Sequence, residues 1–546
     1  MASASDSIVK TRVYQGDPLV ARKYPSLGIQ EIELHPGAVV FDGPVSPRFA
    51  VVDYDASNNK LFPPARFQRR QRQFEARPNS PQFRQVNAWA VAQLTLEMYE
   101  DPKVLGRRIP WAFPGNRLFI LPHAGYWENA LYDRKTRTLQ FFYFQGQEKP
   151  IYTALSHDII SHETGHAILD GIRPLYNEIS SPDTAGFHEF IGDATAILLA
   201  FSHQAYRKAV IQEARGNLRK DTIVASLADE FGTGLYGSAG RYFLRNAIND
   251  MTMSKVRYTW ESHVYSEVLT GAFYEILIGL YEKQQDLEAR KARKRGARPN
   301  RIAALSRAVV HMRRLALRAL DYCPPVDISY LDYARALLRA DELAYPKDEL
   351  GYRNVVRRVF RRRGIAATNH ELEPEPTPPR DAFETYTFAD VDDSTVSAYH
   401  FLDRHRRLLE IPPNQDFHVA SLYGNAKEGD RLHQMPRELI LTYVWEKDIL
   451  LSGRRYGPLN NQTFPLLCGG TLVMDERANL LYLCRKKDDP EREERLRDYL
   501  AYLARQNAIG HVDDPEARDK PFHYELRRGR VSLTQNRLAM HQRRRR

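Results

Sequence analysis

The spacing of apolar residues along the chain changes from strand-like to helical near residue 153. Upstream, two short apolar runs, Leu118–Leu121 and Leu139–Phe144, are separated by polar segments and predict strands. From Thr153, apolar residues and two histidines recur at steps of three and four residues until Gly171 and Pro174. That period predicts a helix, and the glycine and proline predict its end.

Helical patterns then dominate up to residue 366. They cover Phe187–Ala205, Ser262–Glu282, Ile302–Leu320, Tyr330–Ala344 and Tyr352–Arg362, and an earlier helix is expected over Gln85–Tyr99. A Pro- and acid-rich stretch at 367–380 cannot continue a helix and predicts a linker. Beyond it, two strand-like segments, Leu439–Leu451 and Phe464–Leu483, precede a charged helical pattern at Pro490–Arg505.

The composition is that of a soluble globular protein with several domains. The chain has 546 residues, 43% hydrophobic and 27% charged, so about two to four domains are expected. The first residues do not resemble a signal peptide, and no apolar run is long enough to span a bilayer. We therefore expect no membrane span and a cytoplasmic location, with export by a route other than Sec left open. Three widely spaced cysteines give no disulfide framework, which favours a reducing compartment.

Positive charge is concentrated in arginine-rich clusters. The formal net charge is +11, and arginines gather at 66–72, 290–301, 357–363 and 543–546. Basic patches of this kind can bind nucleic acid or acidic membranes. Aromatic residues do not alternate with the basic runs as a groove for single strands requires, and charge runs are most often solvated faces. Nucleic acid is therefore not expected as a partner.

The helix predicted after Thr153 carries the motif HExxH at residues 162–166. Helix positions i and i+4 share a face, so the imidazoles of His162 and His166 can reach one metal ion. Glu163 then points beside the metal, where it can take a proton from a water molecule. The motif also occurs by chance on helices whose histidines are merely exposed or buried. A catalytic zinc site further needs a third protein ligand and one open position.

Glu189 can be the third ligand. It lies near the start of the next helical pattern, and Asp193 follows one turn later on the same face. Asp193, and Asp170 one turn past His166, are expected to accept the outer N–H of a liganding histidine and fix its tautomer. Asp158, His162, His166 and Asp170 form a polar stripe at four-residue spacing. Such a stripe is also found on solvent-exposed helices. The pattern predicts one Zn²⁺ per chain, held by His162, His166 and Glu189.

The chain resembles the thermolysin-like gluzincin peptidases over residues 85–366. Six segments resemble motifs of that family and follow in the family's order: Asn129–Tyr132, Asp158–Asp170, Glu189–Asp193, Leu244–Asn246, Ser262–Tyr274 and Val355–Ile365. In the family, the first three segments are, in this order, an edge strand that pairs with substrate backbone, the active-site helix and the third-ligand helix. The last three are a segment with a substrate-binding arginine, a segment with an oxyanion-stabilising histidine, and the closing helix of the α-lobe. Chance does not readily give six ordered matches.

The resemblance implies roles for the remaining site residues. His263 would donate a hydrogen bond to the tetrahedral oxyanion, with Tyr176 as its tyrosine partner. Arg245 would bind a substrate carbonyl, while Asn129 and the backbone of Ala130 would bind the substrate chain. A histidine at a helix entry is also a common structural residue, and this chain has 30 tyrosines.

The resemblance also implies an α+β fold and its division into domains. A thermolysin-like zincin has a β-containing N-terminal lobe and an α-helical C-terminal lobe, and a small additional α+β domain is expected to follow. We assign 1–85 to a β-containing N-terminal extension, 86–170 to the peptidase N-lobe with the edge strand and active-site helix, 171–366 to the helical lobe, 367–380 to the linker, 381–510 to the additional domain of unassigned role, and 511–546 to a basic polar tail.

Several features depart from the family. The gap between His166 and Glu189 is longer by a few residues, which alters the loop that contains Tyr176. His188 stands where the family tends to have an asparagine, and His188 as a metal ligand is a minor alternative. The acidic residues of the family's calcium sites are not evident after Glu189, so calcium is not expected.

Three functions are consistent with these observations. The first is a neutral zinc endopeptidase or oligopeptidase acting on peptides or proteins, in which Glu163 activates the water that attacks the peptide bond. The second is an exported toxin or effector with the same metallopeptidase chemistry. The third is a catalytically silent scaffold with a peptidase-like fold, but the histidines and glutamates of the proposed site are all present, which argues against it. The oligomeric state is left open.

Overall fold

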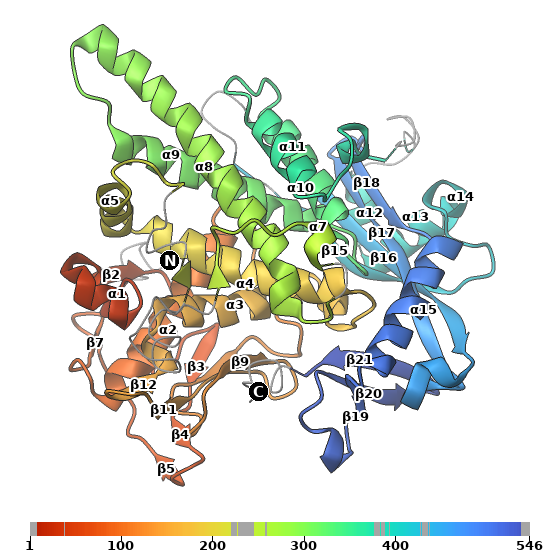
Figure 1. The fold of residues 1–546 in the computed structure, drawn as a ribbon, viewed down its shortest axis with the longest axis horizontal. Helices are drawn as coiled ribbons and strands as arrows, with labels where there is room; N and C mark the ends of the chain where they lie inside the picture. The colour runs from red at the N-terminus through yellow and green to blue at the C-terminus, as the bar shows by residue number, and fades with distance from the viewer. Residues whose placement is uncertain are drawn as a thin grey trace.

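The computed structural model describes residues 8–37, 39–219, 226–227, 245–256, 259–375, 383, 388–392, 394–425, 427–428, 435 and 437–536. Over these residues the chain has the expected α+β class, with several separate sheets and a mainly helical middle. Figure 1 shows the N-terminal strands and the C-terminal sheet on opposite sides of the central helices. Among the described residues, no helix combines the length and apolarity that a bilayer span needs.

Two four-stranded sheets form the N-terminal part, with strand orders β2-β1-β7-β6 and β3-β8-β10-β9. Their strands are β1 Val9–Tyr14, β2 Ile29–Leu34, β3 Phe49–Val51, β6 Arg66–Gln68, β7 Gln73–Glu75, β8 Leu118–Leu121, β9 Ala130–Asp133 and β10 Thr138–Phe141. Two small pairs accompany them: β4 Tyr54–Asp55 with β5 Lys60–Leu61, and β11 Tyr143–Gln145 with β12 Pro150–Tyr152. Strand β9 is the edge of its sheet, which is the place that the resemblance implies for this segment.

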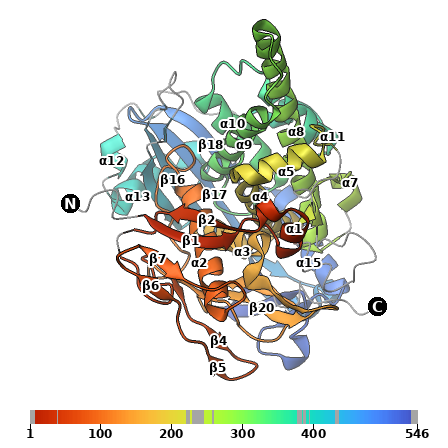
Figure 2. The ribbon, with the colours of Figure 1, turned by 90° about the vertical axis from the view of Figure 1, so that its left-hand side faces the viewer.

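Helix α2 (Pro81–Glu100) packs against strands of both sheets and against the central helices. Ser80 accepts the N–H of Phe83 at its start. The helix has apolar residues on nearly every side, and a helix without a polar face is stable only when it is buried. Figure 2 shows β1 and β2 next to α2, which they cover.

The helical region contains α3 His157–Ile172, α4 Pro182–Ser202, α5 Gln204–Glu213, α7 Met253–Val256, α8 Ser262–Arg295, α9 Arg301–Arg318, α10 Tyr330–Ala344 and α11 Tyr352–Arg362. Helix α8 extends well beyond the predicted end at Glu282. Its last turns are rich in Lys, Arg, Gln, Glu and Ala, which favour helix without giving an apolar period. Gly296 ends the helix in the left-handed conformation, at φ 60°.

A seven-stranded sheet dominates the C-terminal part, in the order β15-β16-β17-β21-β20-β19 with β18 paired to β17. The strands are β15 Phe417–Asn425, β16 Glu438–Leu451, β17 Gln462–Asp475, β18 Leu480–Lys486, β19 Ile509–His511, β20 Phe522–Arg527 and β21 Arg530–Gln535. The helices are α12 Phe388–Asp392, α13 Thr395–Arg404, α14 Arg406–Leu409 and α15 Pro490–Arg505.

The expectation of a polar tail from residue 511 is wrong for residues 522–535. These residues form the hairpin β20–β21, which pairs Phe522 with Gln535 and Arg527 with Arg530. Phe522, Val531 and Leu533 of the hairpin are buried in the core of the C-terminal sheet. Strands with one solvated face carry polar residues at every second position. The many charged residues in this hairpin therefore make its buried apolar positions hard to recognise in the sequence.

Buried ion pairs join the C-terminal sheet to the helical region. The side chain of Asp321, which follows α9, is fully buried and lies 2.7 Å from Arg107 and 3.0 Å from Lys427. Lys427 also lies 3.0 Å from Glu438 of β16. Burial alone would raise the pKa of Asp321, but the two cations outweigh it and hold that pKa well below its usual value. Separation of the two parts would leave charges without partners, so this network fixes their contact.

Candidate metal centre

Two capped, buried helices carry the candidate site. Ser156 accepts the N–H of Ile159 at the start of α3, and Ser181 accepts the N–H of Thr184 at the start of α4. Every residue of α3 is buried. Polar side chains on such a helix need partners inside the protein, because a buried polar group without one is costly.

His162, His166 and Glu189 come together where α3 packs on α4. All three are buried, and they offer ligand atoms that lie within 4.8 Å of one another. The Nε2 atoms of His162 and His166 lie 3.5 Å and 3.8 Å from the two carboxylate oxygens of Glu189. In a tetrahedral site with metal–ligand distances of about 2.0–2.1 Å, neighbouring ligand atoms are about 3.3–3.4 Å apart. The donor set is therefore one that can hold a metal ion, and its ligand types are among those that zinc takes.

Outer contacts orient the two histidines toward this point. Nδ1 of His162 lies 3.2 Å from Oδ1 of Asp193, which is the contact that the spacing of α4 predicts. Asp193 is held in turn by Thr270 of α8, whose hydroxyl donates to Oδ2 over 3.0 Å. Nδ1 of His166 lies 3.4 Å from Nδ1 of His188, so His188 supports a ligand and is not part of the ligand set.

Gly192 leaves room for the ring of His162. A Cβ atom at this position would lie 2.5 Å from Nδ1 and Cε1 of the imidazole. Such contacts are too short for any side chain, and they involve a ring held between α3 and α4. Glycine is therefore required here by close packing rather than by backbone conformation.

Glu163 lies beside the ligand set and is 3% exposed. Its Oε2 accepts the N–H of Tyr132 in β9 over 2.9 Å. The other side of β9 pairs with β10, so the free edge of the sheet faces α3. A carboxylate held in this way next to a metal position is placed for proton transfer with a water molecule.

His263 approaches the ligand set from the first turn of α8. Its Nε2 lies 3.1 Å from Oε2 of Glu189, and its Nδ1 lies 2.8 Å from Oε1 of Glu261. Burial would lower the pKa of His263, but Glu189 and Glu261 outweigh it and raise the pKa to about 10. For Glu189, burial would raise the pKa, but His263 and His166 hold it well below its usual value. Glu261, His263 and Glu189 thus form one cluster in which opposite charges stabilise each other.

The predicted substrate-binding residues lie at the start of the edge strand. Asn129 is buried, and its Oδ1 accepts the N–H of Ala130 over 2.8 Å. The backbone carbonyl of Asn129 accepts the N–H of Phe142. Within the described part of the chain, its Nδ2 has no hydrogen-bond partner. A buried amide donor without a partner is unfavourable unless a ligand completes it.

Tyr176, expected as the partner of His263, is engaged elsewhere. Its side chain is fully buried, and its hydroxyl donates to the carbonyl of Pro324 over 2.6 Å. The altered loop after α3 packs this tyrosine into the core, where burial raises its pKa well above the usual value. The structure therefore does not place Tyr176 as an oxyanion donor.

Asp170 has other partners than expected, and the prediction for Arg245 is not tested. Asp170 accepts hydrogen bonds from the hydroxyl of Tyr132 and from Nε of Arg134, each over 2.7 Å, so it supports β9 instead of a liganding histidine. The reason is that a full cation from the neighbouring strand hairpin reaches this carboxylate. Residues 245–246 form strand β14, but the side chain of Arg245 lies outside the described residues.

Sequence reasoning missed Glu261 and the backbone of Tyr132. Glu261 caps α8 by accepting the N–H groups of His263 and Val264, and it also orients the His263 ring. An acidic residue two positions before a helix-entry histidine is a local signal that could have identified it. The contact of Tyr132 with Glu163 has no such signal, because a backbone donor is present at every residue and only packing selects one.

No protein-family model matches this chain, and no curated protein matches its sequence.

Proposed function

We propose that this chain is a zinc metallopeptidase of the thermolysin-like gluzincin class, which hydrolyses peptide bonds in peptide or protein substrates. The observation that carries the proposal is the convergence of His162, His166 and Glu189. Glu163 follows His162 on the same helix, and Nε2 of His263 lies 3.1 Å from Glu189. Three ligands from two helices leave a position for a water molecule or substrate, which is typical of a catalytic zinc site and not of a structural one.

Each residue has a role that follows from its position. Bound zinc would lower the pKa of its water and polarise the scissile carbonyl. Glu163, anchored by Tyr132, takes the proton from the attacking water and delivers it to the leaving amine. His263, oriented by Glu261 through Nδ1, donates from Nε2 to the oxyanion that forms.

The edge strand suggests how a peptide is held. Substrate in extended conformation would lie along the free edge of β9, near Asn129 and Ala130. Nδ2 of Asn129 would then donate to a substrate carbonyl. In this arrangement the strand would recognise the substrate backbone. That favours an endopeptidase or oligopeptidase over an enzyme that depends on a free terminus.

The proposal is tested by zinc content and by cleavage of a mixed peptide library, for the wild type and for Glu163→Gln. Glu491→Gln, on the exposed face of α15, is the matched control. We expect one zinc per chain in all three proteins and cleavage in the wild type and the control only. Absence of zinc from the wild type, or zinc without cleavage, would contradict the proposal.

A further inference from the structure

The hairpin β20–β21 pairs with the segment that joins α3 to α4. The N–H of Ile179 donates to the carbonyl of Leu533 over 2.9 Å, and Glu178 forms an antiparallel bridge with Thr534. The hydroxyl of Ser532 donates to Oε2 of Glu178 over 2.8 Å. This segment lies between the two histidine ligands and Glu189. The C-terminal sheet therefore continues into the connection between the ligand helices.

The same hairpin contacts the first turn of α8. Nε2 of Gln535 donates to the hydroxyl of Ser262 over 2.8 Å, one residue before His263. Phe522 packs edge-on against Trp260, with ring centroids 6.2 Å apart. The end of β21 thus reaches the point where α8 begins, next to His263.

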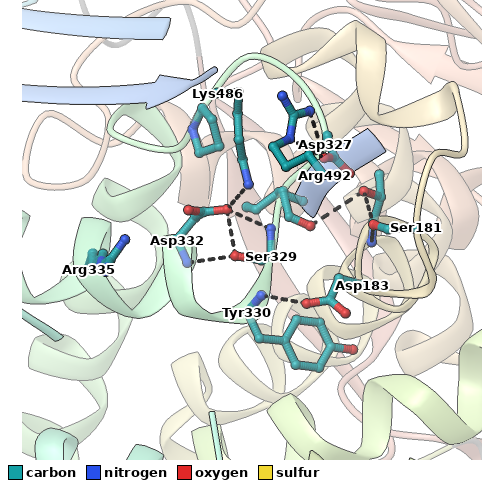
Figure 3. Close-up of polar contacts among 12 residues, drawn as sticks. Ser181, Asp183, Asp327, Ser329, Tyr330, Asp332, Arg335, Lys486 and Arg492 are labelled. Carbon is teal, nitrogen blue, oxygen red and sulfur yellow. Dashed lines mark hydrogen bonds and ion pairs between the residues drawn. The ribbon is translucent and has the colours of Figure 1, made fainter. Parts of the chain in front are cut away.

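Polar contacts between α15, β18 and the helical region support the same arrangement. Figure 3 shows Arg492 and Lys486 directed at Asp327 and Asp332, and Arg492 lies 2.8 Å from Asp327. Asp327 also accepts the hydroxyl of Ser180, next to the cap of α4. These ion pairs are largely buried, so loss of either member would leave a buried charge.

A further carboxylate connects the start of α4 to α8. Asp183 accepts the hydroxyl of Tyr265 over 2.6 Å. It also accepts the N–H of Tyr330 over 3.0 Å (Figure 3). Tyr265 lies half a turn after His263. The N-terminal turns of α4 and α8 are therefore joined to each other directly and to the C-terminal sheet through the hairpin.

We propose that the β20–β21 hairpin is a positioning element of the metal centre, and that Gln535 is its positioning residue for His263. The inference rests on the proposed function for its activity test. A first helical turn has few hydrogen bonds of its own, so the place of His263 depends on contacts such as the one between Gln535 and Ser262. A misplacement of about 1 Å can cost roughly 100-fold in rate.

The first test compares Gln535→Leu with Gln506→Leu, an exposed glutamine at the end of α15, in the full chain. We expect Gln535→Leu to lower kcat roughly 10-fold with KM changed less than about twofold, because only the group that acts in the transition state is displaced. Zinc content and the thermal-unfolding midpoint should match those of the control. An unchanged kcat would overturn the proposal. Parallel loss of zinc and of the folded state would also overturn it, since that pattern indicates general destabilisation.

A second measurement does not depend on peptidase activity. Amide hydrogen exchange in the zinc-loaded protein should be roughly 3- to 10-fold faster at residues 262–266 in Gln535→Leu than in Gln506→Leu, which corresponds to the loss of one hydrogen bond. If the wild type cleaves no peptide, the proposed function fails, but faster exchange still supports the positioning role. Equal exchange in both variants would overturn the inference whatever the activity.

Discussion

Replacement of Gly192 by alanine tests whether His162 must occupy its present position to bind the metal. Gly192 lies in α4 between Glu189 and Asp193, facing the imidazole. The added Cβ would lie 2.5 Å from Nδ1 and Cε1 of His162 and 2.7 Å from Nε2, whereas ordinary contacts of a Cβ atom begin at 3.4 Å. The ring must therefore move by roughly 1 Å or rotate out of its place.

The effect on the metal should be much larger than the effect on the fold. Metal–ligand distances tolerate about 0.2 Å, so a shift of this size removes His162 from the ligand set. Loss of an outer partner alone lowers metal affinity roughly 10- to 100-fold, and loss of a ligand should exceed that range. Alanine is about 1 kcal/mol more favourable than glycine within a helix, which offsets part of the strain in the metal-free protein.

The assay is a zinc titration against a chromophoric chelator, with circular dichroism as the check of folding. Ser202→Ala, at the exposed end of the same helix, is the control. We expect the zinc dissociation constant of Gly192→Ala to rise more than about 100-fold while its helix signal stays that of the control. A folded Gly192→Ala that binds zinc within threefold of the wild type would refute the assignment of His162 as a ligand.

Three further changes test the metal centre, a buried histidine and the ion-pair network of Lys427. Asp193→Ala removes the outer partner of His162 and should weaken zinc binding roughly 10- to 100-fold in the same titration; an unchanged constant would contradict that role. Burial, with a neighbouring histidine and arginine, lowers the pKa of His203 to about 3. The unfolded chain takes up this proton near pH 6.5, so stability falls as the pH drops from about 6.5 toward 3. Between pH 7 and 5 the free energy of urea unfolding should fall by about 2 kcal/mol more in the wild type and in the exposed control His400→Gln than in His203→Gln, and equal losses would count against this explanation. Lys427→Met leaves two buried carboxylates without their shared cation, which should cost about 3–5 kcal/mol and lower the thermal-unfolding midpoint by several degrees; a midpoint within one degree of the wild type would contradict the network.

The sequence predicted best those elements whose signals are local. Helices α10, α11 and α15 have the bounds that the helical sequence pattern indicates, because an amphipathic stripe is a short-range feature. The end of α8 was missed because a solvated helix has no apolar period. The hairpin β20–β21 was missed because its partners are distant in the chain; Ser532 and Glu178, for example, are 354 positions apart.

For the candidate site, local spacing in the sequence predicts which residues share a helix face. The four-residue spacing from His162 to His166, and from Glu189 to Asp193, is enough to align each pair, because α-helix geometry is the same in every protein. Which distant groups meet these pairs depends on how whole elements pack. Packing of α3 on α4 joins the ligands, α8 brings His263 and Glu261 to Glu189, and the core takes Tyr176 away. The physical reason is that long-range contacts depend on how complete elements fill space together, and no short stretch of sequence contains that information.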